Sequence, residues 1–255
     1  MMRAVDFNAD LGESFGLWER GADAALMEVI SSANVACGFH AGDPSTIRTS
    51  VERAVARGVA VGAHPGFPDL LGFGRRALQV SEPVLRDYVI YQVGAVRQFA
   101  ALAGVELHHV KPHGALYMMA LEDLAYARAI AEATARIDER LLMYTLGGSA
   151  LWDAASQAGL RPVSEFFADR PTRASGEVVM FQWWEEFEAT PEAVAERARA
   201  AMVDGTVKTL EGVPLTVEAD TVCVHSDTPR ADELGRAVHR ALESAGLTIR
   251  PHPQS

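Results

Sequence analysis

Short apolar segments alternate with longer amphipathic segments along most of the chain. The short segments have the length of strands, and the longer ones repeat their apolar positions with the period of a helix. The predicted strands are 4–9, 35–37, 59–63, 107–110, 141–145, 161–164 and 221–224. The predicted helices are 43–57, 81–103, 121–137, 149–158, 191–203 and 230–245. This alternation of about seven strand–helix units fits either a closed β/α barrel or an open doubly wound sheet.

Two of these helices begin with capping residues. Asp43 is predicted to cap the first helix, with Pro44 in its first position, and Ser81 is predicted to cap the second. We therefore expect both helices to start close to these residues.

Polar side chains follow nearly every predicted strand. They are Asn8, Asp10, Glu13, His40, Asp43, His64, Asp69, Lys111, His113, Glu165, Asp169, Arg170, His225 and Asp227. In a barrel the C-terminal ends of all strands converge on one face, whereas an open sheet uses only its switch point. The distribution therefore favours an α/β barrel with a site built from several strand ends. The chain length fits one such domain, predicted to span residues 1–255.

Glycine and proline occur in four of the loops that carry these groups, at 10–13, 37–43, 63–66 and 111–114. Glycine permits a positive φ and a close approach of the backbone to a ligand, and proline fixes a turn. Ordinary turns use the same residues, so one such loop is weak evidence. Four of them, each with an ionisable group at the same end of the sheet, indicate a rigid functional site.

Charge and hydropathy exclude several classes of function. The formal net charge is −11 and the longest basic run is Arg75-Arg76, so we expect no binding to nucleic acid. No stretch approaches the roughly 20 apolar residues of a membrane span. Residues 1–10 lack the apolar core of a signal peptide, so we expect a cytoplasmic protein with no membrane contact. Cys37 and Cys223 are the only cysteines and predict no disulfide scaffold.

Several candidate chemistries remain. Asp10, His64 and His113 form an acid-plus-two-histidine set of the kind that binds zinc or another divalent ion, although their spacing does not test this. A GxSxG elbow is absent, which argues against a serine nucleophile. Segment 72–76 (GFGRR) follows no strand and lacks the P-loop lysine, so it is not a nucleotide loop. Arg75 or Arg76 in that segment is a candidate for holding a carboxylate or phosphate; a solvated pair on the barrel rim is the alternative.

Six segments resemble the LamB/YcsF family, which includes the A subunit of bacterial ATP-dependent 5-oxoprolinase. They are 8–13 (NADLGE), 32–43 (SANVACGFHAGD), 62–66 (GAHPG), 72–76 (GFGRR), 110–117 (VKPHGALY) and 167–170 (FADR). The resemblance extends from residue 4 to about residue 246. It implies a distorted seven-stranded β/α (TIM-like) barrel of the glycoside hydrolase/deacetylase-like superfamily. It also implies the opening of 5-oxoproline to glutamate, with ATP hydrolysis carried by partner subunits B and C.

The resemblance is weakest in two places. Ser226 stands where the family usually has glycine, and no tyrosine lies near Thr172. The arginine that the family usually carries shortly after Gly176 is also missing. If that arginine binds the substrate carboxylate, region 171–190 predicts a preference for a different lactam or amide; a neutral loop change is the alternative.

Hydrolysis of an amide requires activation of water, stabilisation of an oxyanion and protonation of the leaving nitrogen. Asp10 or Glu13 is the predicted general base, Lys111 with His113 stabilises the oxyanion, and His40 or His64 donates the proton. Only two of the 23 basic residues are lysine, which is why Lys111 is singled out. The predicted substrate-binding residues are Asn8, Asp43, Arg75, Asp169, Arg170, His225 and Asp227.

Two alternatives stay open. A metal-dependent, deacetylase-like hydrolase that acts alone on another small amide would contain stoichiometric metal. A non-catalytic subunit would bind the lactam without contributing to turnover. A homo-oligomer is compatible with each of these hypotheses.

Overall fold

Seven parallel strands close into a barrel in the computed structural model, which describes residues 3–254. The strands are β1 (Ala4–Leu11), β2 (Ser32–Ala36), β3 (Ala60–His64), β4 (His109–Val110), β5 (Leu142–Thr145), β6 (Arg161–Phe167) and β9 (Thr221–His225). Each pairs with the next along the chain, and β9 pairs back with β1. The predicted barrel is therefore confirmed, and the open sheet is excluded.

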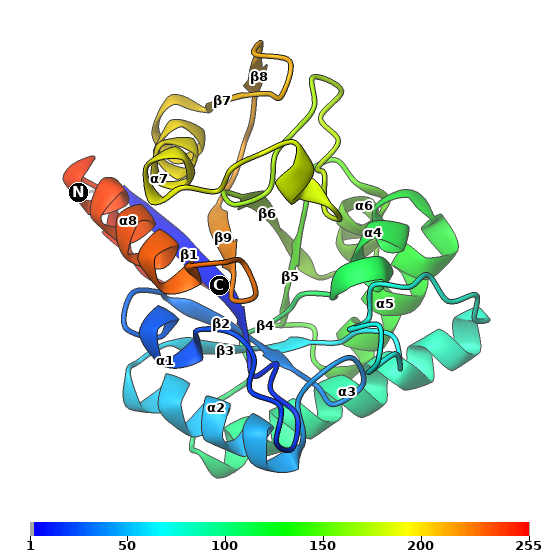
Figure 1. The fold of residues 1–255 in the computed structure, drawn as a ribbon. Coiled ribbons are helices and arrows are strands. Elements are labelled where there is room, and N and C mark those ends of the chain that lie inside the picture. Colours follow the sequence, from blue (N-terminus) through cyan, green and yellow to red (C-terminus); the bar gives the residue numbers. More distant parts are fainter. Residues whose placement is uncertain (1–2, 255) are drawn as a thin grey trace.

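Helices surround this barrel (Figure 1). They are α1 (Asp23–Leu26), α2 (Pro44–Ala56), α3 (Glu82–Leu102), α4 (Gly114–Glu122), α5 (Leu124–Ile137), α6 (Ala150–Gln157), α7 (Pro191–Arg199) and α8 (Ala231–Ser244). Within residues 3–254, no helix has both the length and the apolar character needed to cross a membrane.

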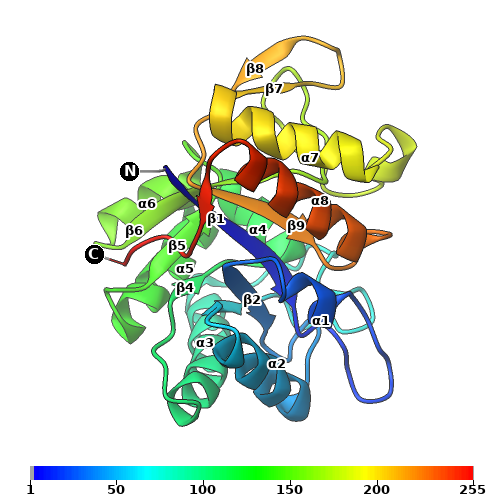
Figure 2. The same ribbon diagram turned by 90° about the vertical axis from the view of Figure 1, so that its left-hand side faces the viewer.

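Two small additions lie outside the ring of strands. A π-helical turn (Ala200–Asp204) continues α7 and leads into an antiparallel hairpin of β7 (Thr206–Lys208) and β8 (Pro214–Thr216). Figure 2 shows this hairpin beyond α7, away from the barrel strands. The last strand, β10 (Thr248–Ile249), pairs with the start of β1. It therefore lies at the end of the barrel where the strands begin.

Most predicted helix boundaries were right, but one predicted side-chain cap and one predicted helix start were wrong. Asp43 caps α2 as predicted, since its carboxylate accepts hydrogen bonds from the backbone N–H groups of Ser45 and Thr46. Ser81 precedes α3 but makes no side-chain cap. The predicted helix 121–137 corresponds to α5 but starts three residues too early, because Asp123 ends α4 and its side chain caps α5. Helix α4 itself was not predicted.

Strand β1 shows how the barrel separates apolar from polar side chains. Phe7, Ala9 and Leu11 are fully buried in the main apolar core beneath the helices. The residues between them, Asn8 and Asp10, are also buried but bond to Thr221 of β9 and Asn34 of β2. Because successive side chains of a strand point to opposite faces, the apolar core surrounds the barrel and the interior of the barrel is polar.

Asp6 closes the end of the barrel where the strands begin. One carboxylate oxygen accepts hydrogen bonds from the hydroxyls of Ser31 and Ser32, at 2.6 and 2.7 Å. The other accepts from Tyr144 at 2.8 Å and Thr221 at 2.6 Å. Four hydroxyl donors satisfy this buried carboxylate, which ties β1, β2, β5 and β9 together.

Candidate functional site

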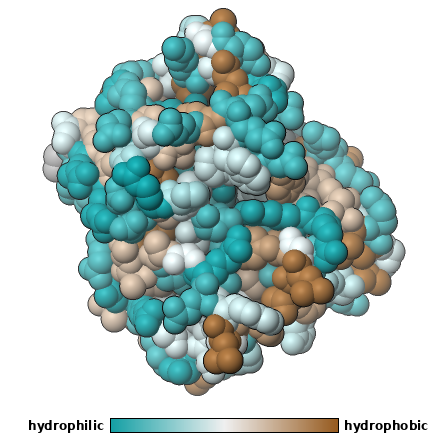
Figure 3. All heavy atoms as spheres, in the orientation of Figure 1, coloured by the Kyte–Doolittle hydropathy of each residue, from teal (hydrophilic) through white to brown (hydrophobic). Residues whose placement is uncertain are grey.

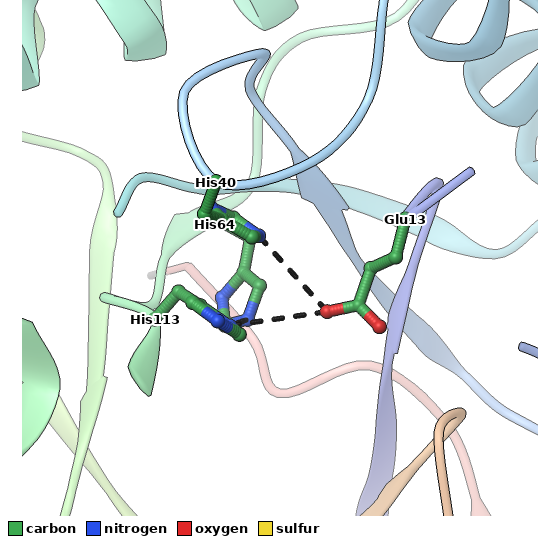
Figure 4. Close-up of side chains that lie close together, drawn as sticks. All are labelled: Glu13, His40, His64 and His113. Atoms are coloured by element: carbon green, nitrogen blue, oxygen red, sulfur yellow. Dashed lines mark hydrogen bonds and ion pairs between the residues drawn. The ribbon is translucent and has the colours of Figure 1, made fainter. Parts of the chain in front are cut away.

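A cluster of ionisable side chains lies at the other end of the barrel, where the strands end. Glu13 follows β1, His40 follows β2, His64 is the last residue of β3, and His113 follows β4. Figure 4 shows these four side chains directed toward one another. All four are buried, and each offers a ligand atom within 4.8 Å of the other three.

Two histidines of the cluster are oriented by backbone carbonyls. His64 Nδ1 lies 2.7 Å from the Lys111 carbonyl oxygen, and His113 Nε2 lies 2.8 Å from the Phe73 carbonyl oxygen. Because a carbonyl only accepts, these two nitrogens carry the protons. The remaining nitrogens, His64 Nε2 and His113 Nδ1, face each other at 3.0 Å with lone pairs. Such an arrangement needs a proton or a cation between the two rings, and second-shell carbonyls of this kind commonly orient metal-binding histidines.

His40 completes the cluster without any hydrogen bond of its own among the described residues. Its ring stacks on His113 with centroids 3.7 Å apart, and its Nε2 lies 4.0 Å from Glu13 Oε1. Gly66 leaves room for it, since a Cβ there would lie 2.5 Å from His40 Nδ1. Burial and the neighbouring His113 and His64 rings lower the pKa of His40 well below its ordinary value. His40 is thus neutral at pH 7, with a lone pair available.

Two carboxylates beside the histidines have pKa values displaced in opposite directions. Burial alone would raise the pKa of Asp10, but His64 and Lys111 hold it well below its ordinary value. Asp10 Oδ2 lies 3.3 Å from His64 Nε2 and 3.7 Å from His225 Nε2. Burial, with the nearby carboxylates of Asp227 and Asp10, raises the pKa of Glu13 well above its ordinary value. The environment therefore favours the ionised form of Asp10 and the protonated form of the neighbouring Glu13, which is a common acid–base arrangement.

Lys111 lies deeper in the barrel, beneath Asp10. Its ammonium is 2.9 Å from Asp10 Oδ1 and 2.8 Å from Glu165 Oε1, the latter an ion pair without hydrogen-bond geometry. It also donates to Cys223 Sγ at 3.1 Å and Asn8 Oδ1 at 3.3 Å. Burial alone would lower the pKa of Lys111, but Asp10, Cys223 and Glu165 raise it well above its ordinary value. Lys111 is a buried cation that holds Asp10 in place.

The other residues predicted to bind substrate or to follow a strand end include two groups. At the barrel mouth, His225 Nδ1 lies 2.9 Å from Asp169 Oδ1, and Arg170 pairs with Asp169 at 2.8 Å. Asp227 lies beside them and pairs with Arg170 and Arg75. All of these residues belong to one network that adjoins the cluster.

Asp43 and Asp69 lie outside that network. Asp43 is occupied as the cap of α2 and also accepts a hydrogen bond from the Gly16 N–H. Asp69 pairs with Arg76, whose side chain is two-thirds exposed. Of the two consecutive arginines, Arg75 therefore reaches the mouth and Arg76 stays at the surface.

Some residues of the site were not found in the sequence. Asn34 bridges Asn8 and Asp10 with hydrogen bonds of 2.8 Å, and His109 Nε2 lies 2.6 Å from Asn34 Oδ1. Asn34 and His109 could have been predicted from the sequence, since each is a polar residue within a short strand of a barrel with a polar interior. Arg20, which pairs with Asp227, lies in a loop without any motif.

Two cavities lie near the site. One of about 1230 Å³ is lined by residues 164–167 of β6 and by residues 175–178, which fall in the divergent region of the sequence. One of about 400 Å³ lies at the mouth and is lined by Arg20, Ser226 and Asp227. The face of the molecule in Figure 3 is largely hydrophilic, with small separate hydrophobic patches. The smaller cavity adjoins the buried cluster through Ser226, which lines the cavity and donates a hydrogen bond to Glu13 at 3.1 Å.

Comparison with known proteins agrees with this architecture. The family model described as LamB/YcsF family matches residues 5–255. The chain belongs to the LamB/YcsF family. It is 49% identical over 249 residues to a protein of Tolumonas auensis that is named as the A subunit of 5-oxoprolinase, covering 98% of this chain and 99% of that protein. The predicted family membership is thus confirmed.

Solved structures extend the comparison. A lactam utilization protein from Thermus thermophilus superposes on this LamB/YcsF chain with a TM-score of 0.92 at 45% identity, covering 98% of this chain and 100% of that one. The catalytic domain of a peptidoglycan N-acetylglucosamine deacetylase from Eubacterium rectale gives a TM-score of 0.51 at 9% identity, covering 100% and 91%. The second similarity concerns the fold alone and confirms a deacetylase-like β/α barrel.

Proposed function

We infer that the chain is the A subunit of an ATP-dependent 5-oxoprolinase, which hydrolyses the lactam amide of 5-oxoproline to glutamate. The observation that supports this most is the 49% identity over nearly the whole length to a protein of that name. The acid–base cluster at the barrel mouth offers groups suited to opening an amide. Partner subunits B and C would carry the ATP cleavage, and the need for ATP argues for the cytoplasm.

Asp10 and Glu13 are the proposed acid–base pair. Asp10 is ionised and suited to accept a proton from the attacking water, whereas Glu13 is protonated and suited to give one to the leaving nitrogen. We prefer Glu13 to His40 as the donor, because the lowered pKa of His40 leaves it neutral. His225, held by Asp169, borders Asp10 and would help to orient it.

Lys111 acts in this proposal through Asp10. Asp10 and Glu165 lie within 3 Å of its ammonium, which is buried beneath the cluster and not directed at the mouth. The negative charge that develops on the lactam oxygen would then be met by a cation in the cluster, because the His113 N–H is already directed at the Phe73 carbonyl.

The cluster also fits a divalent ion. His40, His64 and His113 would supply nitrogen ligands, because the facing lone pairs of His64 and His113 call for a cation. Asp10, the predicted carboxylate ligand, lies beside this cluster, 3.3 Å from His64 Nε2. Such an ion would polarise the amide carbonyl and lower the pKa of a bound water. These features also favour the second candidate function, a metal-dependent hydrolase of another small amide.

One assay separates these functions. Glutamate release from 5-oxoproline is measured with and without ATP, and with and without the candidate partner subunits. We expect turnover only when both are present, and activity of the chain alone would overturn the three-subunit proposal. Metal analysis of the purified protein and chelator treatment test the ion. Asp10→Asn is expected to abolish turnover; a variant that keeps it would indicate a non-catalytic binding subunit.

A further inference from the structure

Three guanidinium groups converge on the single carboxylate of Asp227. Arg20 Nη2 lies 3.2 Å from Asp227 Oδ2, Arg75 pairs with the same oxygen, and Arg170 Nη2 lies 3.4 Å from Oδ1. Arg170 has a second partner in Asp169 at 2.8 Å. Among residues 3–254, Arg20 and Arg75 have no other carboxylate within ion-pair distance. One positive charge is therefore left without its own counterion, in a chain whose net charge is −11.

The two arginines without a second partner are also the accessible ones. The side chains of Arg20 and Arg75 are 42% and 29% exposed, whereas that of Arg170 is 1% exposed. A ligand from solution reaches the first two, and Arg170 serves to fix Asp227. Burial alone would raise the pKa of Asp227, but Arg75 and Arg170 hold it below its ordinary value.

Phe73 holds the two guanidinium groups next to the cluster. The Arg20 guanidinium carbon is 3.8 Å from the centroid of the Phe73 ring, and that of Arg75 is 5.0 Å away. The same ring packs edge-on against His113, with centroids 5.0 Å apart, and its backbone carbonyl orients His113. Phe73 has φ 54°, a left-handed conformation that is rare for a bulky residue and is often found at functional sites.

The backbone at Arg20 is also fixed. Its N–H donates to the Ser14 hydroxyl at 2.9 Å, and that hydroxyl donates back to the Arg20 carbonyl at 3.3 Å. The 400 Å³ cavity at the mouth reaches Arg20, Asp227 and Ser226, and Ser226 bonds to Glu13. An anion bound by Arg20 would thus lie close to the acid–base pair, with Ser226 between the anion and Glu13.

We propose that Arg20 and Arg75 form a subsite for an oxyanion, and that its occupant is the carboxylate of the lactam substrate. Asp227 holds the two side chains in place when no substrate is bound. Guanidinium groups suit this role because their planar N–H donors match a carboxylate. The inference rests on the proposed function and adds a specificity to it: the enzyme selects lactams that carry a carboxylate.

The test compares two lactams in the complex assembled with its partner subunits. 5-Oxoproline has the carboxylate, and 2-pyrrolidinone is the same ring without it. We expect Arg20→Gln to lower kcat/KM for 5-oxoproline roughly 10- to 100-fold, mainly through KM, and to leave that for 2-pyrrolidinone unchanged. Arg75→Gln is the second variant, and Arg48→Gln, an exposed arginine of α2 that pairs with Glu52, is the matched control.

The possible results differ clearly. An equal loss for both lactams would indicate a structural role and overturn the proposal. If Arg20→Gln leaves the KM for 5-oxoproline unchanged but abolishes competition by inorganic phosphate, the subsite binds phosphate and the carboxylate assignment is wrong. If the wild-type complex hydrolyses both lactams equally well, the specificity is overturned while the lactam-opening function stands. If it hydrolyses neither, the proposed function itself is overturned.

Discussion

Replacing Lys111 by methionine removes the only cation that contacts both Asp10 and Glu165 among the described residues. Each contact, at 2.9 and 2.8 Å, corresponds to about 6 kcal/mol of Coulomb attraction at an effective dielectric constant of about 20. The cost of removing Lys111, Asp10 and Glu165 from water offsets much of this attraction. Removal of Lys111, however, leaves the two carboxylates buried without their counterion. We therefore expect Lys111→Met to lower the free energy of unfolding by about 3–5 kcal/mol.

Urea unfolding followed by circular dichroism measures this change. Lys208→Met is the matched control, because Lys208 is exposed on β7 and its replacement should change the free energy by less than about 0.5 kcal/mol. Glu165→Gln in the Lys111→Met background should recover part of the loss, since one stranded carboxylate becomes neutral. A Lys111→Met protein within about 1 kcal/mol of wild type would refute the reasoning, because the cation would then not be needed to hold the two carboxylates.

Other predictions concern packing, capping and pH. Gly66→Ala should destabilise the protein by about 1–3 kcal/mol and reduce turnover, because the new Cβ would lie 2.5 Å from His40 Nδ1. Gly94→Ala is the control, since its Cβ meets nothing within 4 Å and should not destabilise the protein. Equal melting temperatures for the two variants would contradict this. Asp43→Ala should cost about 1 kcal/mol in urea unfolding through loss of the α2 cap, and no change would show the cap to be redundant. Burial raises the pKa of Asp23 to about 6, so its protonated form is favoured on folding and the stability it contributes is lost as pH rises from about 4 through 6. Asp23→Asn should therefore stabilise the protein more at pH 7 than at pH 4, and a pH-independent difference would contradict the shift.

The sequence was sufficient for the barrel because apolar segments mark six of its seven strands well. It failed where a strand carries polar residues that face inward. Strand β2 begins at Ser32, three residues before the predicted start, because Ser32 and Asn34 point into the polar interior and interrupt the apolar run. Helix α4 was missed for the opposite reason, since it is apolar almost throughout and has no amphipathic period.

The site was predictable only where short motifs carry it. His40, His64, Lys111 and His113 lie in glycine- and proline-containing loops, and the structure brings them to one end of the barrel. Arg20 has no such context. Its partner Asp227 is 207 residues away along the chain, and only the closure of β9 onto β1 brings the two together.

The alternation in β1 also limits how this protein can change. Insertion or deletion of one residue between Asp6 and Asp10 would exchange the two faces of the strand. Phe7 and Leu11 would then enter the polar interior, and Asp10 would enter the apolar layer beneath the helices. A point substitution alters one contact at a time. A change in the length of this segment would at once disrupt the closed end of the barrel at Asp6 and displace the proposed catalytic carboxylate of Asp10. The spacing between Asp6 and Asp10 is therefore constrained by the alternation of the strand.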